Sequence, residues 1–176
     1  MVKKFTGMGF EVTVESGAGL NSGFTDKIFE DVGAKIATDT KDALKDADIV
    51  FKIQRLMTSK DKIDEITMCK KNAMVISHMS ALSAKDDIEE YAKASITTFA
   101  MDLMPRISRA QSMDVLSSQS NLSGYQAVIK GANNFNSAFP MMMTAAGTVA
   151  PAKIFIMGVG VAGLQAIATA KRMGAI

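Results

Sequence analysis

The sequence predicts an α/β fold with parallel sheets, and two observations indicate it. Short apolar segments typical of strands alternate with amphipathic segments typical of helices through the N-terminal part of the chain. Near the end of the chain, an apolar run leads into a glycine-rich turn and then into another helical pattern. Because parallel strands must be joined by crossover segments, usually helices, this alternation favours a parallel sheet with helices on its faces.

The elements follow in order along the chain. The predicted strands are the apolar or alternating runs at 11–15, 34–37, 48–53, 73–78 and 95–101. The predicted helices are the end of one at Val2–Phe5, broken by the glycines that follow it, and others near 25–32, 40–45, 61–69 and 84–93. A glycine-rich loop, SGAGLNSGF, follows the first strand.

The closing stretch KIFIMGVGVAGLQAIATAKRMGAI has the pattern of a dinucleotide-binding unit. Ile154–Met157 is expected to be a strand buried on both faces, and Gly158, Gly160 and Gly163 form a G-x-G-x-x-G turn before a helix. The first glycine permits the tight turn, the second lets backbone N–H groups approach a pyrophosphate, and the third lets the helix pack closely. This context favours a nucleotide site over a purely structural turn.

The expected continuation of that unit lies beyond the sequence. The acidic residue that grips the adenosine ribose is expected about 20 residues after the turn. We therefore expect an interior piece of a longer protein, with two Rossmann-like domains that are both incomplete. The expected boundaries are residues 1–121 for the N-terminal domain, 122–150 for a connecting helix and linker, and 151–176 for the start of the NAD-binding domain.

Composition narrows the class of protein. The net charge is +2, from 20 basic and 18 acidic residues that are scattered, so no nucleic-acid partner is indicated. The single cysteine, Cys69, excludes an internal disulfide, and one cysteine with one histidine argues against a zinc site. No apolar run is long enough to span a bilayer without interruption. The three methionines 141–143 are expected to pack in a core or between domains.

A polar stretch, PRISRAQSMDVLSSQSNLSGYQAV, runs from Pro105 to Val128. It follows a predicted strand end and is expected to be a loop that enters a helix near 113–116. Ligands of open α/β sheets bind at the carboxyl ends of strands, so a functional loop is slightly favoured over a solvated surface loop.

This stretch, with AFPMMMTAAGTVAPAKIFIMGVGVAGLQAIATAKRMGA, closely resembles the alpha subunits of proton-translocating nicotinamide nucleotide transhydrogenases. The similarity extends back through SHMSAL, VFKIQ and GFEVTVESGAG, so it covers essentially the whole chain. The run Arg-Ala-Gln-Ser-Met-Asp is specific, whereas the glycine motif alone is not. The wider relatives are the alanine dehydrogenases.

The resemblance implies a component that binds NAD(H) in a cleft between two domains. It implies direct hydride transfer to or from NADP(H) on a partner, the beta subunit or NADP-binding domain, coupled to proton movement through a membrane part. It further implies a homodimer of the NAD-binding component, located at the cytoplasmic face of the inner membrane. The fragment alone is expected to be inactive.

The resemblance also implies roles for particular residues. Arg106 and Asp114 would orient the nicotinamide carboxamide, Gln111 would lie towards the partner nucleotide, and these three form the predicted catalytic group. The remaining predicted contacts to the cofactor are Ile107, Ser108 and Ser117 near the ring and Gly158, Gly160, Val161 and Gly163 under the pyrophosphate. No metal ion is expected, and no residue needs to act as an acid or base, because direct hydride transfer breaks no O–H or N–H bond.

Two other functions stay open at this stage. Alanine dehydrogenases use a histidine where this chain has His78, but place a substrate-binding lysine where it has Gln54; Lys52, nearby, stays a candidate cation for a keto acid. His78 is equally compatible with a structural role at a strand end. A non-catalytic nucleotide-sensing or assembly module is the third hypothesis, and the intact Arg-Ala-Gln-Ser-Met-Asp run speaks against it.

Overall fold

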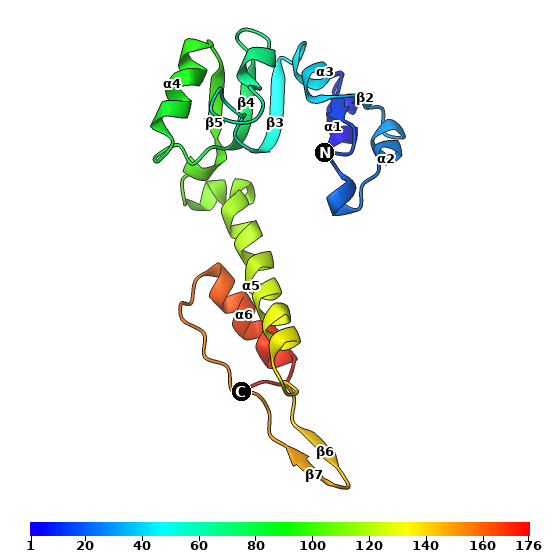
Figure 1. The fold of residues 1–176 in the computed structure, drawn as a ribbon, viewed down its shortest axis with the longest axis vertical. Coiled ribbons are helices and arrows are strands. Elements are labelled where there is room, and N and C mark those ends of the chain that lie inside the picture. Colours follow the sequence, from blue (N-terminus) through cyan, green and yellow to red (C-terminus); the bar gives the residue numbers. More distant parts are fainter. The chain divides into compact units, whose positions relative to one another are not determined.

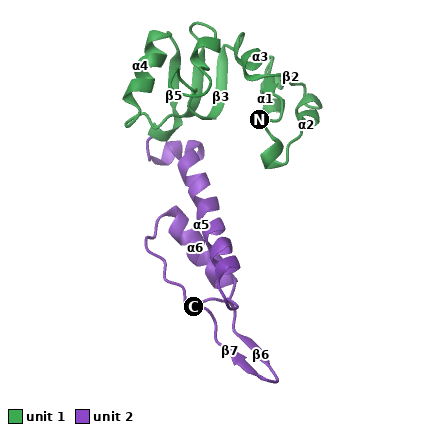
Figure 2. Ribbon diagram, viewed as in Figure 1, with its two compact units in different colours: residues 1–103 green, residues 104–176 purple.

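The structure is a computed structural model that describes all of residues 1–176. The chain forms two compact units, Met1–Leu103 and Met104–Ile176 (Figure 2). This division depends on internal contacts and does not test the domain boundaries expected from the sequence, which stay a prediction.

The first unit contains two parallel sheets, as the β-α alternation predicts. Strands β1 (Thr13–Glu15) and β2 (Lys35–Ala37) pair in parallel. Strands β3 (Ile49–Gln54), β4 (Met74–His78) and β5 (Thr97–Ala100) form a parallel sheet in that order (Figure 1). The expected mixed α/β class with parallel strands is therefore confirmed.

The helices of the first unit are short. They are α1 (Val2–Gly7), α2 (Asp26–Glu30), α3 (Thr40–Leu44) and α4 (Lys85–Lys93), with short 3-10 turns at η1 (Leu20–Ser22), η2 (Ile66–Met68) and η3 (Met101–Leu103). Asp39 caps α3 by accepting a hydrogen bond from the Asp42 N–H at 2.7 Å.

The helix predicted over 61–69 is wrong, because only η2 forms there. Acidic side chains of this segment accept hydrogen bonds from loop backbone: Asp61 from Thr58 N–H at 2.8 Å, Asp64 from Ile66 N–H at 3.1 Å. Such side chain–backbone bonds offer the chain an alternative to the helical ladder, and here they prevail.

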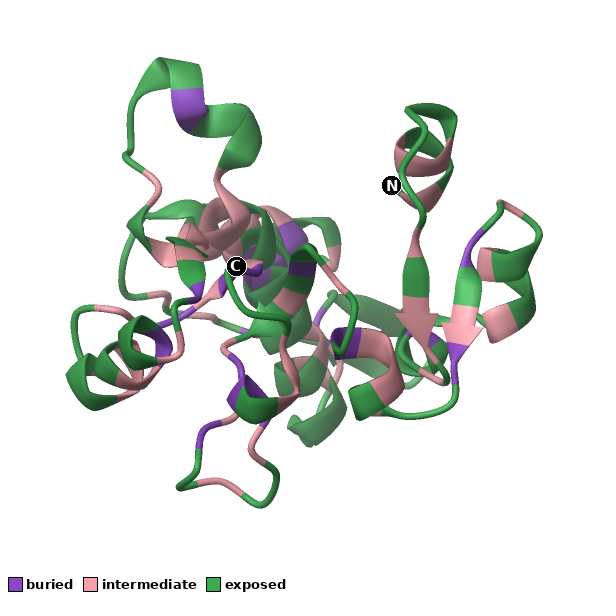
Figure 3. Cartoon of the chain, turned by 90° about the horizontal axis from the view of Figure 1, so that it is seen from above, coloured by how far each residue is buried: buried purple, intermediate pink, exposed green.

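The core of the first unit lies on one face of the β3–β4–β5 sheet. Its buried members are apolar side chains from the strands, the loop after β3 and helix α4: Leu44, Val50, Leu56, Ile66, Val75, Met79, Tyr91 and Ile96. On the opposite face of β3, Phe51 is 53% and Ile53 90% exposed, and Phe5 of α1 stacks on Phe51 with ring centroids 5.3 Å apart. The sheet thus has one well-covered face, and buried residues form only short stretches of the chain (Figure 3).

The second unit is built around two helices that lie side by side, α5 (Val115–Asn134) and α6 (Val161–Arg172) (Figure 1). The 3-10 segment η4 (Ser108–Met113) precedes α5, so the helix begins where the sequence predicts it. Val128 of α5 and Ala166 and Ala170 of α6 belong to the buried cluster of this unit.

A hairpin that the sequence did not predict follows α5. Strands β6 (Met142–Thr144) and β7 (Gly147–Val149) pair antiparallel, and every residue in them is exposed. The expectation that the methionines 141–143 form a core is wrong in this unit, since Met143 is 75% exposed. A two-stranded hairpin buries too little surface to form a core of its own.

The segment before the glycine turn is extended, but it is not the doubly buried strand that was predicted. Phe155 and Met157 are 88% and 86% exposed, while Ile154 and Ile156 pack against the second unit's core. Ile154 N–H donates to the Ile176 carbonyl at 2.7 Å, and Ile176 N–H donates to the Ala152 carbonyl at 2.8 Å. This is the hydrogen-bond pattern of a parallel pair, so the strand has one neighbour and one covered face.

No helix of the chain is both long and apolar enough to cross a membrane. No group of three or more His, Cys, Asp or Glu side chains is arranged to hold a metal ion.

Candidate functional site

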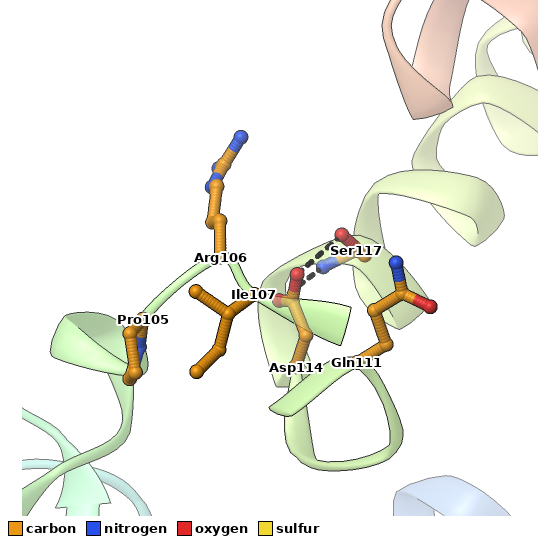
Figure 4. Close-up of a pocket in the computed structure, with 6 residues that line it drawn as sticks. All are labelled: Pro105, Arg106, Ile107, Gln111, Asp114 and Ser117. Atoms are coloured by element: carbon orange, nitrogen blue, oxygen red, sulfur yellow. Dashed lines mark hydrogen bonds between the residues drawn. The ribbon is translucent and has the colours of Figure 1, made fainter. Parts of the chain in front are cut away.

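The predicted polar loop forms a hollow of about 390 Å³ at the start of α5. Its lining residues come from the loop, from η4 and from the first turn of the helix: Pro105, Arg106, Ile107, Gln111, Asp114 and Ser117 (Figure 4). Five of the six residues predicted on this loop therefore lie together. Ser108 does not line the hollow, and Pro105 was not predicted.

Asp114 is the N-cap of α5. One carboxylate oxygen accepts the Ser117 N–H at 2.9 Å, and the other accepts the Ser117 hydroxyl at 2.6 Å. The hydroxyl, then the backbone N–H groups and finally the charge of Arg106 lower the pKa of Asp114. The carboxylate is thus held as an anion at the helix start, with its orientation fixed by Ser117.

Arg106 and Gln111 extend outward on opposite sides of the Asp114–Ser117 pair (Figure 4). Both are exposed, and neither forms a hydrogen bond or ion pair with another side chain. Their donors and the Gln111 carbonyl are therefore free for a ligand. A fixed anion between a free guanidinium and a free amide suits a planar polar group such as a carboxamide.

The glycine turn adopts the geometry that its motif predicts. Gly158 has φ +94°, a conformation that favours glycine, and Gly160 caps α6 without a side chain. A Cβ at Gly163 would overlap the Gly158 carbonyl oxygen and lie 2.8 Å from its carbon. The third glycine therefore allows the helix to pack against the turn, and the first N–H groups of α6, from Val161 onward, have no partner within the helix.

The loop and the turn belong to the same compact unit but do not line one cavity. Gly158, Gly160, Val161 and Gly163 lie at the start of α6, whereas the hollow lies at the start of α5. The two groups are connected through the contact between these helices.

His78 lies at the carboxyl end of β4, opposite Gln54 of β3 in the parallel register. The loop after it is held by Asp102, whose carboxylate accepts the Met79 N–H at 2.7 Å and the Ala81 N–H at 3.1 Å. Burial alone would raise the pKa of Asp102, but these N–H groups and His78 lower it. The only sequence signal for this anchor was an acid directly after a strand end.

Lys52, the remaining candidate cation on β3, is already paired. Its ammonium lies 2.6 Å from a carboxylate oxygen of Glu65, a residue that is 3% exposed, and Glu65 also accepts the Met57 N–H at 2.6 Å. Arg55 is likewise engaged, with Asp61 at 2.8 Å and Asp87 at 3.0 Å. The cations near the end of β3 are therefore neutralised within the protein.

Family models match almost the whole chain. The model described as Alanine dehydrogenase/PNT, N-terminal domain, matches residues 1–123, and the corresponding C-terminal domain matches residues 127–176. The chain belongs to the alanine dehydrogenase/PNT family. This membership confirms the resemblance on which the site residues were predicted.

Within this family, the chain is similar to transhydrogenase alpha subunits. It is 57% identical, over its full length, to the first of the polypeptides that make up NAD(P) transhydrogenase subunit alpha in Rhodospirillum rubrum, of which it covers 46%. The solved structure of transhydrogenase from Sinorhizobium meliloti matches 99% of the chain at 54% identity and a TM-score of 0.92, with 49% of that chain covered. The chain thus spans about half the length of these relatives.

An L-alanine dehydrogenase structure matches 99% of the chain with a TM-score of 0.83 at 23% identity, covering 47% of that chain. At this identity the match supports the fold alone. Together the two structural matches confirm the Rossmann-like α/β fold, and membership of this family implies binding of a nicotinamide nucleotide and an oxidoreductase function.

Proposed function

We propose that this chain is the NAD(H)-binding part of a proton-translocating transhydrogenase, which exchanges a hydride directly between NAD(H) and NADP(H). The observation that carries the proposal is a polar hollow with free Arg106 and Gln111 donors in the same compact unit as a G-x-G-x-x-G turn. The hollow suits a nicotinamide carboxamide, and the N–H groups after the turn suit a pyrophosphate.

In this proposal the side chains orient the nucleotide and do not exchange protons with it. Arg106 donates to the carboxamide, Asp114 accepts from it, and Ile107, Ser108 and Ser117 border the ring. Gln111 lies on the side from which the NADP(H) ring approaches. The bound dinucleotide supplies the hydride chemistry, and the protein supplies orientation and exclusion of water.

A dehydrogenase acting on a 2-oxo acid is less compatible with these residues. Such a substrate needs a cation for its carboxylate, and Gln54 carries no charge. Lys52 is held by the buried Glu65, and taking it away would leave an unpaired buried carboxylate. A sensing module is also less compatible, because binding alone does not require free groups around the nicotinamide end.

The proposal includes the partners that the resemblance implies. An NADP(H)-binding beta subunit or domain presents the second nucleotide, the NAD-binding component forms a homodimer, and the membrane part belongs to the partner at the cytoplasmic face of the inner membrane. The subunit names of the relatives support a complex of several parts. We also propose that residues 1–176 by themselves do not perform the exchange.

The test is Gln111→Asn in the full-length protein. Shortening this side chain is expected to slow single-turnover hydride transfer at saturating NADH by about tenfold or more, while the Kd for NADH changes by only a few fold. Gln126→Asn, an exposed position further along α5, is the matched control and leaves both quantities unchanged. A loss confined to NADH affinity would refute the aligning role, and turnover of alanine or pyruvate without NADP(H) exchange would refute the function.

A further inference from the structure

Helix α5 contains a glycine that permits an unusually close contact with α6. A Cβ added at Gly124 would overlap the backbone carbonyl oxygen of Ala162 and lie 2.9 Å from its carbonyl carbon and 3.0 Å from its Cα. These are backbone atoms, which cannot rotate out of the way as the end of a side chain does. Any residue larger than glycine at this position therefore requires one helix to move.

The point of contact is the first turn of α6, directly after the glycine turn. Ala162 lies two residues after the N-cap Gly160. On another side of the same helical turn, Gly163 leaves room only for the Gly158 carbonyl. The first turn of α6 is therefore confined by two contacts that exclude a Cβ, one with the phosphate-facing turn and one with α5.

The same helix α5 carries the polar hollow at its start. Asp114 caps it and Ser117 lies in its first turn, which is seven residues, or about 10 Å along the axis, before Gly124. A helix is stiff over this length, so displacement at Gly124 is transmitted to its N-terminal end. The Gly124–Ala162 contact thus connects the nicotinamide end of the proposed site to its pyrophosphate end.

We infer that Gly124 is a positioning residue, which sets the spacing between the Arg106–Ser117 hollow and the Gly158–Gly163 turn so that one dinucleotide can occupy both. The inference rests on the proposed function. Gly124 touches no nucleotide itself and acts through α6.

A second glycine in α5 provides a matched control. Gly131 lies two turns further along the helix and has nothing within 4 Å of an added Cβ. Alanine there removes unfolded-state freedom and improves helix propensity without any clash. Gly131→Ala is therefore expected to leave the site unchanged and to raise the thermal midpoint slightly, whereas the identical change at Gly124 is expected to lower it.

The experiment compares Gly124→Ala, Gly131→Ala and Val128→Ala in the full-length protein assembled with its NADP(H)-binding partner. Val128 is a buried core residue of the same helix, so truncating it destabilises the unit without enforcing a wider helix spacing. We expect Gly124→Ala to lower the hydride-transfer rate at saturating NADH by about ten- to a hundredfold, because misplacement by about 1 Å has effects of that size. The two other variants retain the wild-type rate per folded site.

The outcomes separate the inference from the proposed function. If Gly124→Ala loses stability but keeps the wild-type rate at saturating NADH, the glycine is only structural and the inference is overturned. If Val128→Ala lowers the rate as much at equal loss of stability, it is overturned as well. If Gly124→Ala does not fold, Ala166→Val, which overpacks the same pair of helices more mildly, must reproduce the loss of rate. A wild-type protein that does not bind NADH overturns the proposed function, and the inference with it.

Discussion

At the scale of single residues, Asp114 has two roles that can be separated by substitution. As the N-cap it needs an oxygen that accepts the Ser117 N–H, and as a ligand group it needs a charge beside Arg106. Asp114→Asn keeps the acceptor and removes the charge, while Asp114→Ala removes both.

We expect Asp114→Asn to keep the thermal midpoint of the full-length protein within about a degree or two and to slow hydride transfer. Asp114→Ala is expected to slow transfer and also to lower the midpoint by a few degrees, because α5 loses its cap. Thermal unfolding and single-turnover rates on both variants check this. Equal midpoints for the two would show that the cap is unimportant, and an unchanged rate in Asp114→Asn would remove Asp114 from the site.

The Arg55–Asp61 pair predicts a pH dependence of stability. The Arg55 hydrogen bonds, with those of Thr58, hold the pKa of Asp61 at about 2, below the value of about 3.9 expected in the unfolded chain. Because the folded pKa is lowered, the stabilisation is present above about pH 4 and is lost as the pH falls towards 2.

Urea midpoints measured between pH 5 and pH 2 should therefore fall less steeply for Asp61→Asn than for the wild type. Asp86→Asn is the control, because Asp86 pairs with Lys60 on the surface with its side chain 82% exposed. Parallel wild-type and Asp61→Asn profiles would contradict the proposed contribution of this pair.

At the scale of elements, helix α4 is fastened to the loop after β3 by one buried hydroxyl. Tyr91 is 1% exposed and donates to the Leu56 carbonyl at 2.8 Å, and burial raises its pKa to about 12, so it remains a donor. Tyr91→Phe is expected to lower the free energy of unfolding by about 0.5–1.5 kcal/mol, since Arg55 still donates to that carbonyl.

The control is Tyr125→Phe, at a position that is 47% exposed, which should change the free energy of unfolding very little. Denaturant titrations of the two variants decide the matter. If both behave alike, the Tyr91 hydroxyl contributes nothing that water does not replace.

The elements also show what the sequence can predict and what it cannot. The parallel strands and the start of α5 were predictable, because apolar runs and the capping residue are local signals. The absence of a helix at 61–69 was not, because it depends on Asp61, Asp64 and Glu65 bonding to backbone and to cations outside a helical pattern. The β6–β7 hairpin was missed because its two-residue turn, Ala145-Ala146, lacks the Asn-Gly or Asp-Gly signal.

The candidate site was predictable to a similar extent. The residues of the polar loop and the glycine turn came from a motif and a resemblance, and the structure gathers most of the loop residues around one hollow. Gly124 was not predictable, because a glycine inside a helical pattern carries no sign of the backbone that it faces. The pairing of Lys52 with Glu65 was also hidden, since the two lie on different elements.

At the scale of the whole molecule, the strand before the glycine turn has one parallel neighbour and an exposed apolar face. A turn is held rigidly only when its strand is fixed within a sheet, so we expect residues 1–176 expressed alone to bind NADH weakly, with a Kd above about 100 μM. Calorimetric titration of this 176-residue protein is the test. One-to-one binding at low micromolar Kd would show that the hollow and the turn suffice by themselves.

The central claim is that NAD(H) held by this chain exchanges a hydride directly with NADP(H), and isotope transfer tests it most directly. The complete transhydrogenase complex containing this chain is supplied with NADH deuterated at C4 of the nicotinamide, together with NADP⁺, and the NADPH formed is analysed by mass spectrometry. The account predicts that the deuterium moves to NADPH without exchange with water, and that Gln111→Asn slows this transfer. Deuterium released to solvent, or transferred to a 2-oxo acid instead of NADP⁺, would contradict it.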